Sequence, residues 1–181
     1  MALLGEPLYQ RSPQHYTSHA QTPFDHATTY AALARSGSVG LIAFPMGQSY
    51  YTQGYWIYRQ AFQKVLKDVL PAPLIQTDAP LCAELSLTHQ AARPDARRKA
   101  RYMVHIVNYS PVRGTPKHQV FYEDPVPLMN VTVRLNLPLK TSVARAVVAG
   151  LDLPVRRAAG GGVEALVPRV AIHEIVSFEE S

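Results

Sequence analysis

The clearest pattern along the chain is an alternation of apolar and polar residues in its second half. Over 130–137, Val131, Val133 and Leu135 alternate with polar residues, which places apolar side chains on one face of a strand. Similar short runs recur about every ten residues, and turn residues separate them, among them the glycines at 160–162, which are typical of a hairpin turn. This spacing predicts a C-terminal antiparallel β-sandwich. The expected strands span 83–90, 102–109, 119–123, 130–137, 142–149, 153–157, 162–167 and 172–178.

The first part of the chain shows a different pattern, in which an apolar run precedes a helical stretch. Residues 38–45 form a continuous apolar run that predicts a strand buried on both faces, as in a parallel sheet. Residues 55–70 repeat apolar side chains at helical spacing, and Pro71 ends the predicted helix. Residues 1–37 show little periodicity, with a brief helix expected around 27–34.

Together these patterns predict an α+β, mostly-β chain with two parts. A strand followed by a helix is half of an α/β unit, so we expect residues 1–78 to be a partial α/β, flavodoxin-like segment whose earlier strands are missing. Residues 79–181 are expected to form the antiparallel β-sandwich.

Charge and cysteine content narrow the class of protein. The chain carries a formal charge of +5, much of it in the basic stretch 93–101 between two expected strands. This stretch is rich in Ala and Pro and lacks interleaved aromatic readers, so we interpret it as a solvated hairpin loop and expect no nucleic-acid partner. The single cysteine, Cys82, allows no intramolecular disulfide.

The chain shows no sequence signal for a membrane or for export. No apolar run approaches the roughly 18 residues of a membrane span. The first residues lack the charged and apolar regions of a signal peptide. We therefore expect a cytoplasmic protein without a membrane partner.

The candidate catalytic residues do not form a recognisable active site. Glu123 and Asp124 are adjacent, so on a strand their side chains point to opposite faces, whereas glycoside hydrolysis needs two carboxylates flanking one bond. Cys82 lacks the tight glycine-flanked elbow of a hydrolase nucleophile and is interpreted as a small apolar residue entering a strand. We therefore predict no catalytic residue and no cofactor in this chain.

Two clusters remain as possible contact residues. His15 and His19 are four residues apart, but their segment is a poor helix, so a loop at an interface is favoured over a metal site with Asp25. Residues 47–58 concentrate aromatic side chains, which stack on sugars and are common at interfaces. We therefore single out four residues for interface or sugar contact: His15, His19, Tyr51 and Trp56.

Five segments in a fixed order resemble a known family. They are HYTSHAQTP at 15–23, GYWIYRQ at 54–60, LPAPL at 70–74, VHIVNYSP at 104–111 and EDPVPL at 123–128. In this order they resemble the C-terminal region of bacterial glycoside hydrolases that contain a β-galactosidase-type trimerisation domain. The resemblance implies a catalytic TIM barrel first, then a non-catalytic glutamine-amidotransferase-like α/β domain, and then a small β-sandwich.

The resemblance implies that the catalytic carboxylates would lie upstream of Met1. The chain would then be a non-catalytic accessory or oligomerisation region of a β-galactosidase-like or α-L-fucosidase-like parent. Its partners would be other copies in an oligomer, or an upstream TIM barrel, and carbohydrate is a possible ligand. Two alternatives stay open: a stand-alone carbohydrate-binding sandwich with exposed Tyr102, Tyr109 or Tyr122, and a small metal-dependent enzyme that uses His and Asp side chains.

Overall fold

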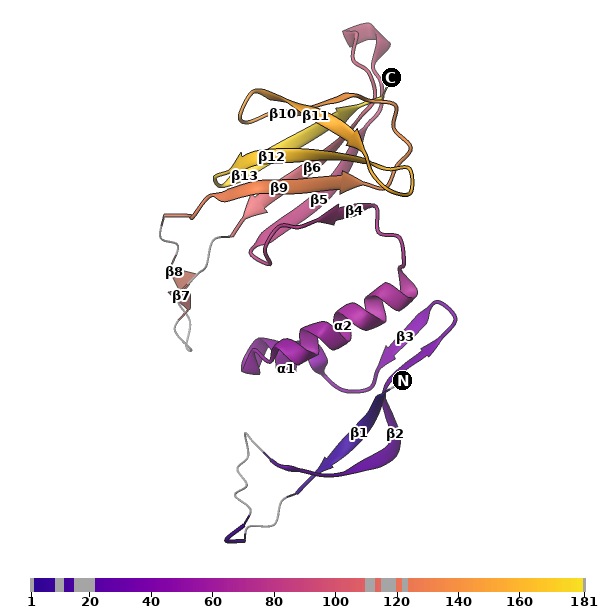
Figure 1. Ribbon diagram of the computed structural model, residues 1–181, viewed down its shortest axis with the longest axis vertical. Coiled ribbons are helices and arrows are strands. Elements are labelled where there is room, and N and C mark those ends of the chain that lie inside the picture. Colours follow the sequence, from indigo (N-terminus) through magenta and orange to yellow (C-terminus); the bar gives the residue numbers. More distant parts are fainter. Residues whose placement is uncertain are drawn as a thin grey trace. The chain divides into compact units, whose positions relative to one another are not determined.

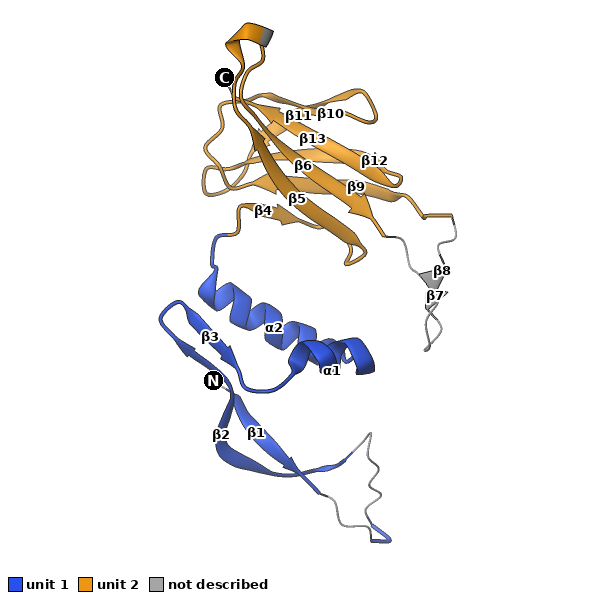
Figure 2. Cartoon of the chain, turned by 180° about the vertical axis from the view of Figure 1, so that it is seen from behind, with its two compact units in different colours: residues 1–72 blue, residues 73–181 orange. Residues whose placement is uncertain are grey.

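The computed structural model describes residues 2–8, 12–14, 22–109, 113–114, 120–121 and 124–180. The chain divides into two compact units, residues 1–72 and 73–181, drawn in different colours in Figure 2. The sequence placed this boundary between residues 78 and 79. No helix in the described part of the chain is long and apolar enough to cross a membrane.

The first unit contains a three-stranded sheet followed by two helices (Figure 1). Strands β1 (Ala2–Pro7), β2 (Phe24–Ser36) and β3 (Val39–Ile42) pair in chain order, and both pairings are antiparallel. Helices α1 (Met46–Gln53) and α2 (Trp56–Val69) follow.

The brief helix expected around 27–34 is wrong, because this segment lies inside β2. Its alanines and leucine have high helix propensity, but propensity is a weak preference that tertiary pairing overrides. Both edges of β2 are occupied, with Ala31 beside Leu3 on β1 and Leu33 beside Ile42 on β3. These partners are distant in sequence and could not be read from the local pattern.

The parallel, doubly buried strand expected at 38–45 is also wrong. Residues 39–42 form β3, which pairs antiparallel with β2 and is mostly exposed. The described strands of the first unit therefore do not show a flavodoxin-like parallel sheet. Helix α2 confirms the helix predicted for 55–70, and it lies close to β3: a Cβ placed on Gly40 would be 2.5 Å from Cγ1 of Val65.

The second unit is built around an antiparallel sheet of eight strands, in the order β4-β9-β12-β11-β10-β13-β6-β5. Seven of the eight predicted strands correspond to members of this sheet. The member without a predicted counterpart is the short edge strand β4. The members are β4 (Ile75–Thr77), β5 (Ala83–Gln90), β6 (Arg101–Asn108), β9 (Leu128–Leu135), β10 (Val143–Ala146), β11 (Leu151–Arg157), β12 (Val163–Val170) and β13 (His173–Glu179). The eighth prediction, 119–123, contains β8 (Val120–Phe121), which pairs with β7 (Arg113–Gly114) in a separate ribbon.

This sheet folds around one apolar core, which agrees with the predicted antiparallel sandwich architecture. Strand β12 contacts β6 and β13, which lie far from it in the strand order, so the sheet curls until its two halves face each other (Figure 1). Strand β11 forms the bend: its first half pairs with β10 and its second half with β12. Pro154 lies at the change of partner, where a residue without a backbone N–H is tolerated.

The alternation read from the sequence defines this core. Val131, Val133 and Leu135 on β9 are buried, as predicted, and they pack in one cluster with Val104 of β6 and Phe178 of β13. The basic stretch 93–101 includes the turn of the β5–β6 hairpin, as predicted.

Candidate interaction surface of the first unit

The junction between α1 and α2 positions the aromatic residues singled out in the sequence. Gly54 ends α1 in the left-handed conformation, with φ of 67°, and its N–H donates to the Tyr50 carbonyl at 2.8 Å. Glycine adopts this conformation without a Cβ penalty, so the chain can turn directly into α2. Tyr51 lies just before the turn and Trp56 just after it.

Tyr51 and Trp56 are both exposed, at 90% and 60% of their surface. Of the other aromatics of this junction, Tyr50 is 39% exposed, and the remaining three form a group around Tyr58. Tyr58 is half-buried, and its ring centroid lies 5.8 Å from that of Phe44 and 6.0 Å from that of Tyr55. The structure therefore shows a packed group around Tyr58, and Tyr51 and Trp56 are the most exposed aromatic side chains of the segment.

Helix α2 presents a second apolar face that the sequence pattern did not separate from the first. Phe62 and Leu66 are 51% and 43% exposed and lie one turn apart, whereas Val65 is half-buried against β3. Their helical spacing in the sequence predicted the helix but not which of them contact solvent. The stripe has the ordinary width of a core-facing helix, so the sequence contained no sign that part of it is exposed.

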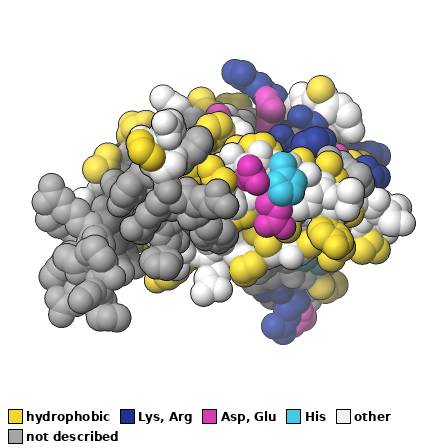
Figure 3. Space-filling model, turned by 90° about the horizontal axis from the view of Figure 1, so that it is seen from below, with side chains coloured by type: hydrophobic (Ala, Val, Ile, Leu, Met, Phe, Trp, Pro, Cys, Tyr) yellow, Lys and Arg dark blue, Asp and Glu magenta, His cyan; other side chains and the backbone are white. Residues whose placement is uncertain are grey.

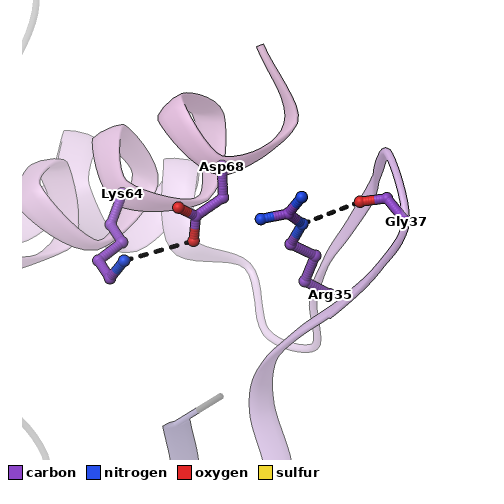
Figure 4. A network of polar contacts seen from close by, with 4 residues as sticks. All are labelled: Arg35, Gly37, Lys64 and Asp68. Atoms are coloured by element: carbon purple, nitrogen blue, oxygen red, sulfur yellow. Dashed lines mark hydrogen bonds and ion pairs between the residues drawn. The ribbon is translucent and has the colours of Figure 1, made fainter. Parts of the chain in front are cut away.

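An open hollow of about 370 Å³ lies beside α2, with apolar walls and a polar rim. Ile57, Ala61 and Leu33 line its walls. The rim carries Arg35, Lys64 and Asp68, which are shown with Gly37 in Figure 4: Lys64 Nζ lies 3.4 Å from Asp68 Oδ2, and Arg35 Nε donates to the Gly37 carbonyl at 2.8 Å. Both interactions are local, so they hold the rim without closing the hollow.

The first unit leaves most of its large apolar side chains in contact with solvent. Among its described residues, the buried hydrophobic side chains are those of Ala32 and Met46. Figure 3 shows hydrophobic side chains, in yellow, exposed on one face of the molecule. Exposed apolar patches of this kind are typical of surfaces that bind another protein. The exposed set in the first unit includes Leu3, Leu4, Phe24, Tyr30, Val39, Leu41, Tyr51, Trp56, Ile57, Phe62, Leu66 and Leu70.

The histidine cluster predicted as a contact or metal site is only partly described. His15 and His19 lie outside the described residues. Asp25 and His26 lie on β2, where Oδ2 and Nδ1 are 3.0 Å apart and both side chains are exposed. Within the part of the chain that the structure describes, no three His, Cys, Asp or Glu side chains come together as a metal site would require.

Several carboxylates of the second unit have structural partners. Asp78 Oδ1 accepts a hydrogen bond from the Thr132 backbone N–H at 2.7 Å. Asp152 Oδ1 pairs with Arg145 at 2.8 Å. Of the adjacent acidic pair in the sequence, Asp124 is exposed and Glu123 lies outside the described residues.

The structure also shows where Cys82 and two of the tyrosines expected to contact sugar lie in the second unit. Cys82 packs against the core just before β5, as predicted for a small residue entering a strand. Tyr102 also packs against the core, whereas Tyr109 is 44% exposed. Tyr122 lies outside the described residues. Of the three tyrosines expected to form an aromatic platform for sugar, Tyr109 is therefore the one whose exposure the described residues show.

Comparison with known proteins relates this fold to glycoside hydrolases. No protein-family model and no curated protein sequence matches the chain. Among solved structures, it is similar to α-L-fucosidase isoenzyme 2 from Paenibacillus thiaminolyticus, with a TM-score of 0.76 and 27% sequence identity. The similarity covers 98% of this chain and 26% of that chain, so this chain spans about a quarter of the length of the fucosidase. The fold is therefore related to that of a glycoside hydrolase.

Proposed function

We propose that this chain is a non-catalytic accessory region of a glycoside hydrolase that assembles the enzyme into an oligomer, with an α-L-fucosidase-like or β-galactosidase-like parent. One observation carries the proposal: almost the whole chain, 98%, matches a segment that makes up 26% of a fucosidase chain. Most residues of such an enzyme would lie outside this region, and the catalytic carboxylates are expected among them.

The exposed apolar side chains of the first unit support an assembly role. Phe62 and Leu66, one turn apart on α2, form an exposed apolar surface that we call the α2 surface. Burying such side chains at an interface stabilises it by about 1.5–3 kcal/mol each. The resemblance to trimerisation domains implies that the assembly contains three copies.

The proposal predicts that the chain self-associates through the α2 surface. The double substitution Phe62→Ser and Leu66→Ser removes two exposed apolar side chains that the proposed interface would bury, and it is expected to weaken association by about 3 kcal/mol, roughly a hundredfold. Sedimentation equilibrium over a range of protein concentrations measures this change. Leu166→Ser is the matched control, because Leu166 is 51% exposed on β12 in the other unit, and its substitution should leave association unchanged.

Three outcomes would contradict the proposal. The first is an unsubstituted chain that stays monomeric at every concentration, and the second is an equal effect of Leu166→Ser on association. The third is turnover of aryl α-L-fucosides or aryl β-galactosides by the purified chain that disappears on substitution of one carboxylate.

A further inference from the structure

The outer face of the second unit carries a hollow that none of the roles described so far uses. It has a volume of about 550 Å³ and lies over β10, β13 and β6. Arg145, Ser177 and Arg101 contribute to it from these three strands, and Lys99 and Lys140 contribute from the flanking loops. A volume of this size is within the range of small-molecule binding sites.

Ser177 is placed at this hollow by the alternation of β13. Its neighbours Val176 and Phe178 are fully buried in the core, so the Ser177 side chain points to the opposite face. There it lies in register with Arg145 of β10 and Met103 of β6. These neighbours leave Ser177 only 5% exposed, although it lines the hollow.

The Ser177 hydroxyl has no hydrogen-bond partner among the described residues. Buried polar atoms of native proteins are almost always paired, and an unpaired one costs about 1–3 kcal/mol. A ligand in the hollow can satisfy this hydroxyl, but the oxygen has almost no exposed surface, so the ligand must displace a side chain that covers it. The hydroxyl can both donate and accept a hydrogen bond.

The charges around Ser177 restrict the kind of ligand. The lining carries four basic and three acidic side chains, so a free anion would meet carboxylates and a free cation would meet ammonium and guanidinium groups. Arg145 and Asp152 already neutralise each other at 2.8 Å. Lys99 and Arg101 supply further donors to the lining, and Glu179 and Glu180 supply further acceptors. Arg101 Nε also donates to Gln90 Oε1 at 2.8 Å, and Glu180 Oε1 lies 3.7 Å from His89 Nε2. A neutral ligand whose hydroxyl groups donate and accept matches this mixture best.

We propose that this hollow binds a neutral polyhydroxylated ligand, a mono- or disaccharide, with the Ser177 hydroxyl paired to a sugar hydroxyl. The site differs from the aromatic platform expected from the sequence, because it relies on polar side chains. It lies within the second unit and does not depend on the proposed assembly role, so either proposal can fail without the other.

The test is a titration of the ¹⁵N-labelled full chain followed by NMR. L-fucose, D-galactose and lactose are the saccharide probes, and sodium sulfate is the anion probe. We expect saturable shifts of the amides of Ser177, Arg145 and Arg101 with at least one saccharide, with a dissociation constant in the millimolar range, and no saturable shifts with sulfate. Ser177→Ala should weaken saccharide binding about tenfold, since one hydrogen bond is lost.

Ser86→Ala is the control, because Ser86 is an exposed serine on β5 of the same unit that does not line the hollow. It should leave saccharide binding unchanged. Three results would overturn the proposal: no saturable shifts at the hollow with any of the saccharides, saturable saccharide binding that Ser177→Ala does not weaken, or saturable binding of sulfate in preference to sugar.

Discussion

At the scale of single residues, Glu174 shows how the second unit satisfies a buried charge. It is 2% exposed, and its carboxylate accepts hydrogen bonds from the backbone N–H groups of Val148, Ala149 and Ile175 at 2.8–3.0 Å. Val148 and Ala149 belong to the turn between β10 and β11. The carboxylate therefore ties that turn to β13 with hydrogen bonds strengthened by its charge.

Glu174→Gln is expected to destabilise the second unit by about 2 kcal/mol. The amide keeps one acceptor oxygen but places an NH2 group against a backbone N–H, which leaves a buried donor unpaired. Urea unfolding followed by circular dichroism measures the change. Glu84→Gln serves as control, because Glu84 is exposed on β5 and its substitution should fall within about 0.5 kcal/mol of zero. Equal stabilities of the two variants would show that the carboxylate does not hold the turn.

At the scale of elements, the β11–β12 hairpin depends on a close approach that only glycine permits. Gly160 and Gly161 have φ of 87° and 93°, and the Gly161 N–H donates to the Ala158 carbonyl at 3.1 Å. Gly162 follows, where a Cβ would lie 2.4 Å from the Leu135 carbonyl oxygen and 3.1 Å from the Asn136 Cα. Both contacts are with backbone, which cannot move aside as a flexible side chain can.

Gly162→Ala should therefore destabilise the second unit by about 2–3 kcal/mol, because β9 and β12 must separate locally. Gly161→Ala is the matched comparison: no atom lies within 4 Å of its added Cβ, so only the left-handed backbone is penalised, by about 1 kcal/mol. Thermal unfolding of the two variants gives the order. A larger effect of Gly161→Ala would mean that backbone conformation, and not the close contact, limits the hairpin.

The two units differ in how well the sequence predicted their elements. In the eight-stranded sheet of the second unit, the strands bury one face and leave the other exposed. Apolar and polar residues therefore alternate along such a strand, as on β9, and the sequence shows this alternation. In the first unit β2 shows no such period, because only Ala32 of its thirteen residues is buried. Local pattern therefore carried little information there.

The candidate sites were predicted less well than the elements, for a related reason. Exposure of Tyr51 and Trp56 follows from the turn at Gly54, which the sequence indicated only by its glycine. The hollow at Ser177 depends on three strands and two loops that meet only after β13 returns beside β6 and β10. A serine in a strand gives no local sign of this, because its neighbours are fixed by pairing across the sheet.

At the scale of the whole molecule, the apolar core is distributed unequally. Every member of the buried core cluster, from Val104 to Phe178, lies in the second unit. The first unit buries only two hydrophobic side chains among its described residues, Ala32 and Met46. Since buried apolar surface supplies most of the stability of a domain, the second unit should be far more stable by itself than the first.

Unfolding of the full chain should accordingly occur in two steps rather than one. The single tryptophan, Trp56, lies in the first unit and reports on it by fluorescence, whereas far-ultraviolet circular dichroism reports on both units, because α1 and α2 lie in the first unit and most strands lie in the second. At a protein concentration low enough to prevent association, the dichroism signal should change in two steps, and the fluorescence transition should coincide with the step at the lower urea concentration. Residues 73–181 expressed alone should retain the second transition at the same midpoint, because they hold the complete core cluster. Coincident transitions, together with a shorter chain that fails to fold, would show instead that the second unit needs the first. In that case the exposed apolar side chains of the first unit would have to be explained by contacts within one chain and not by assembly between chains.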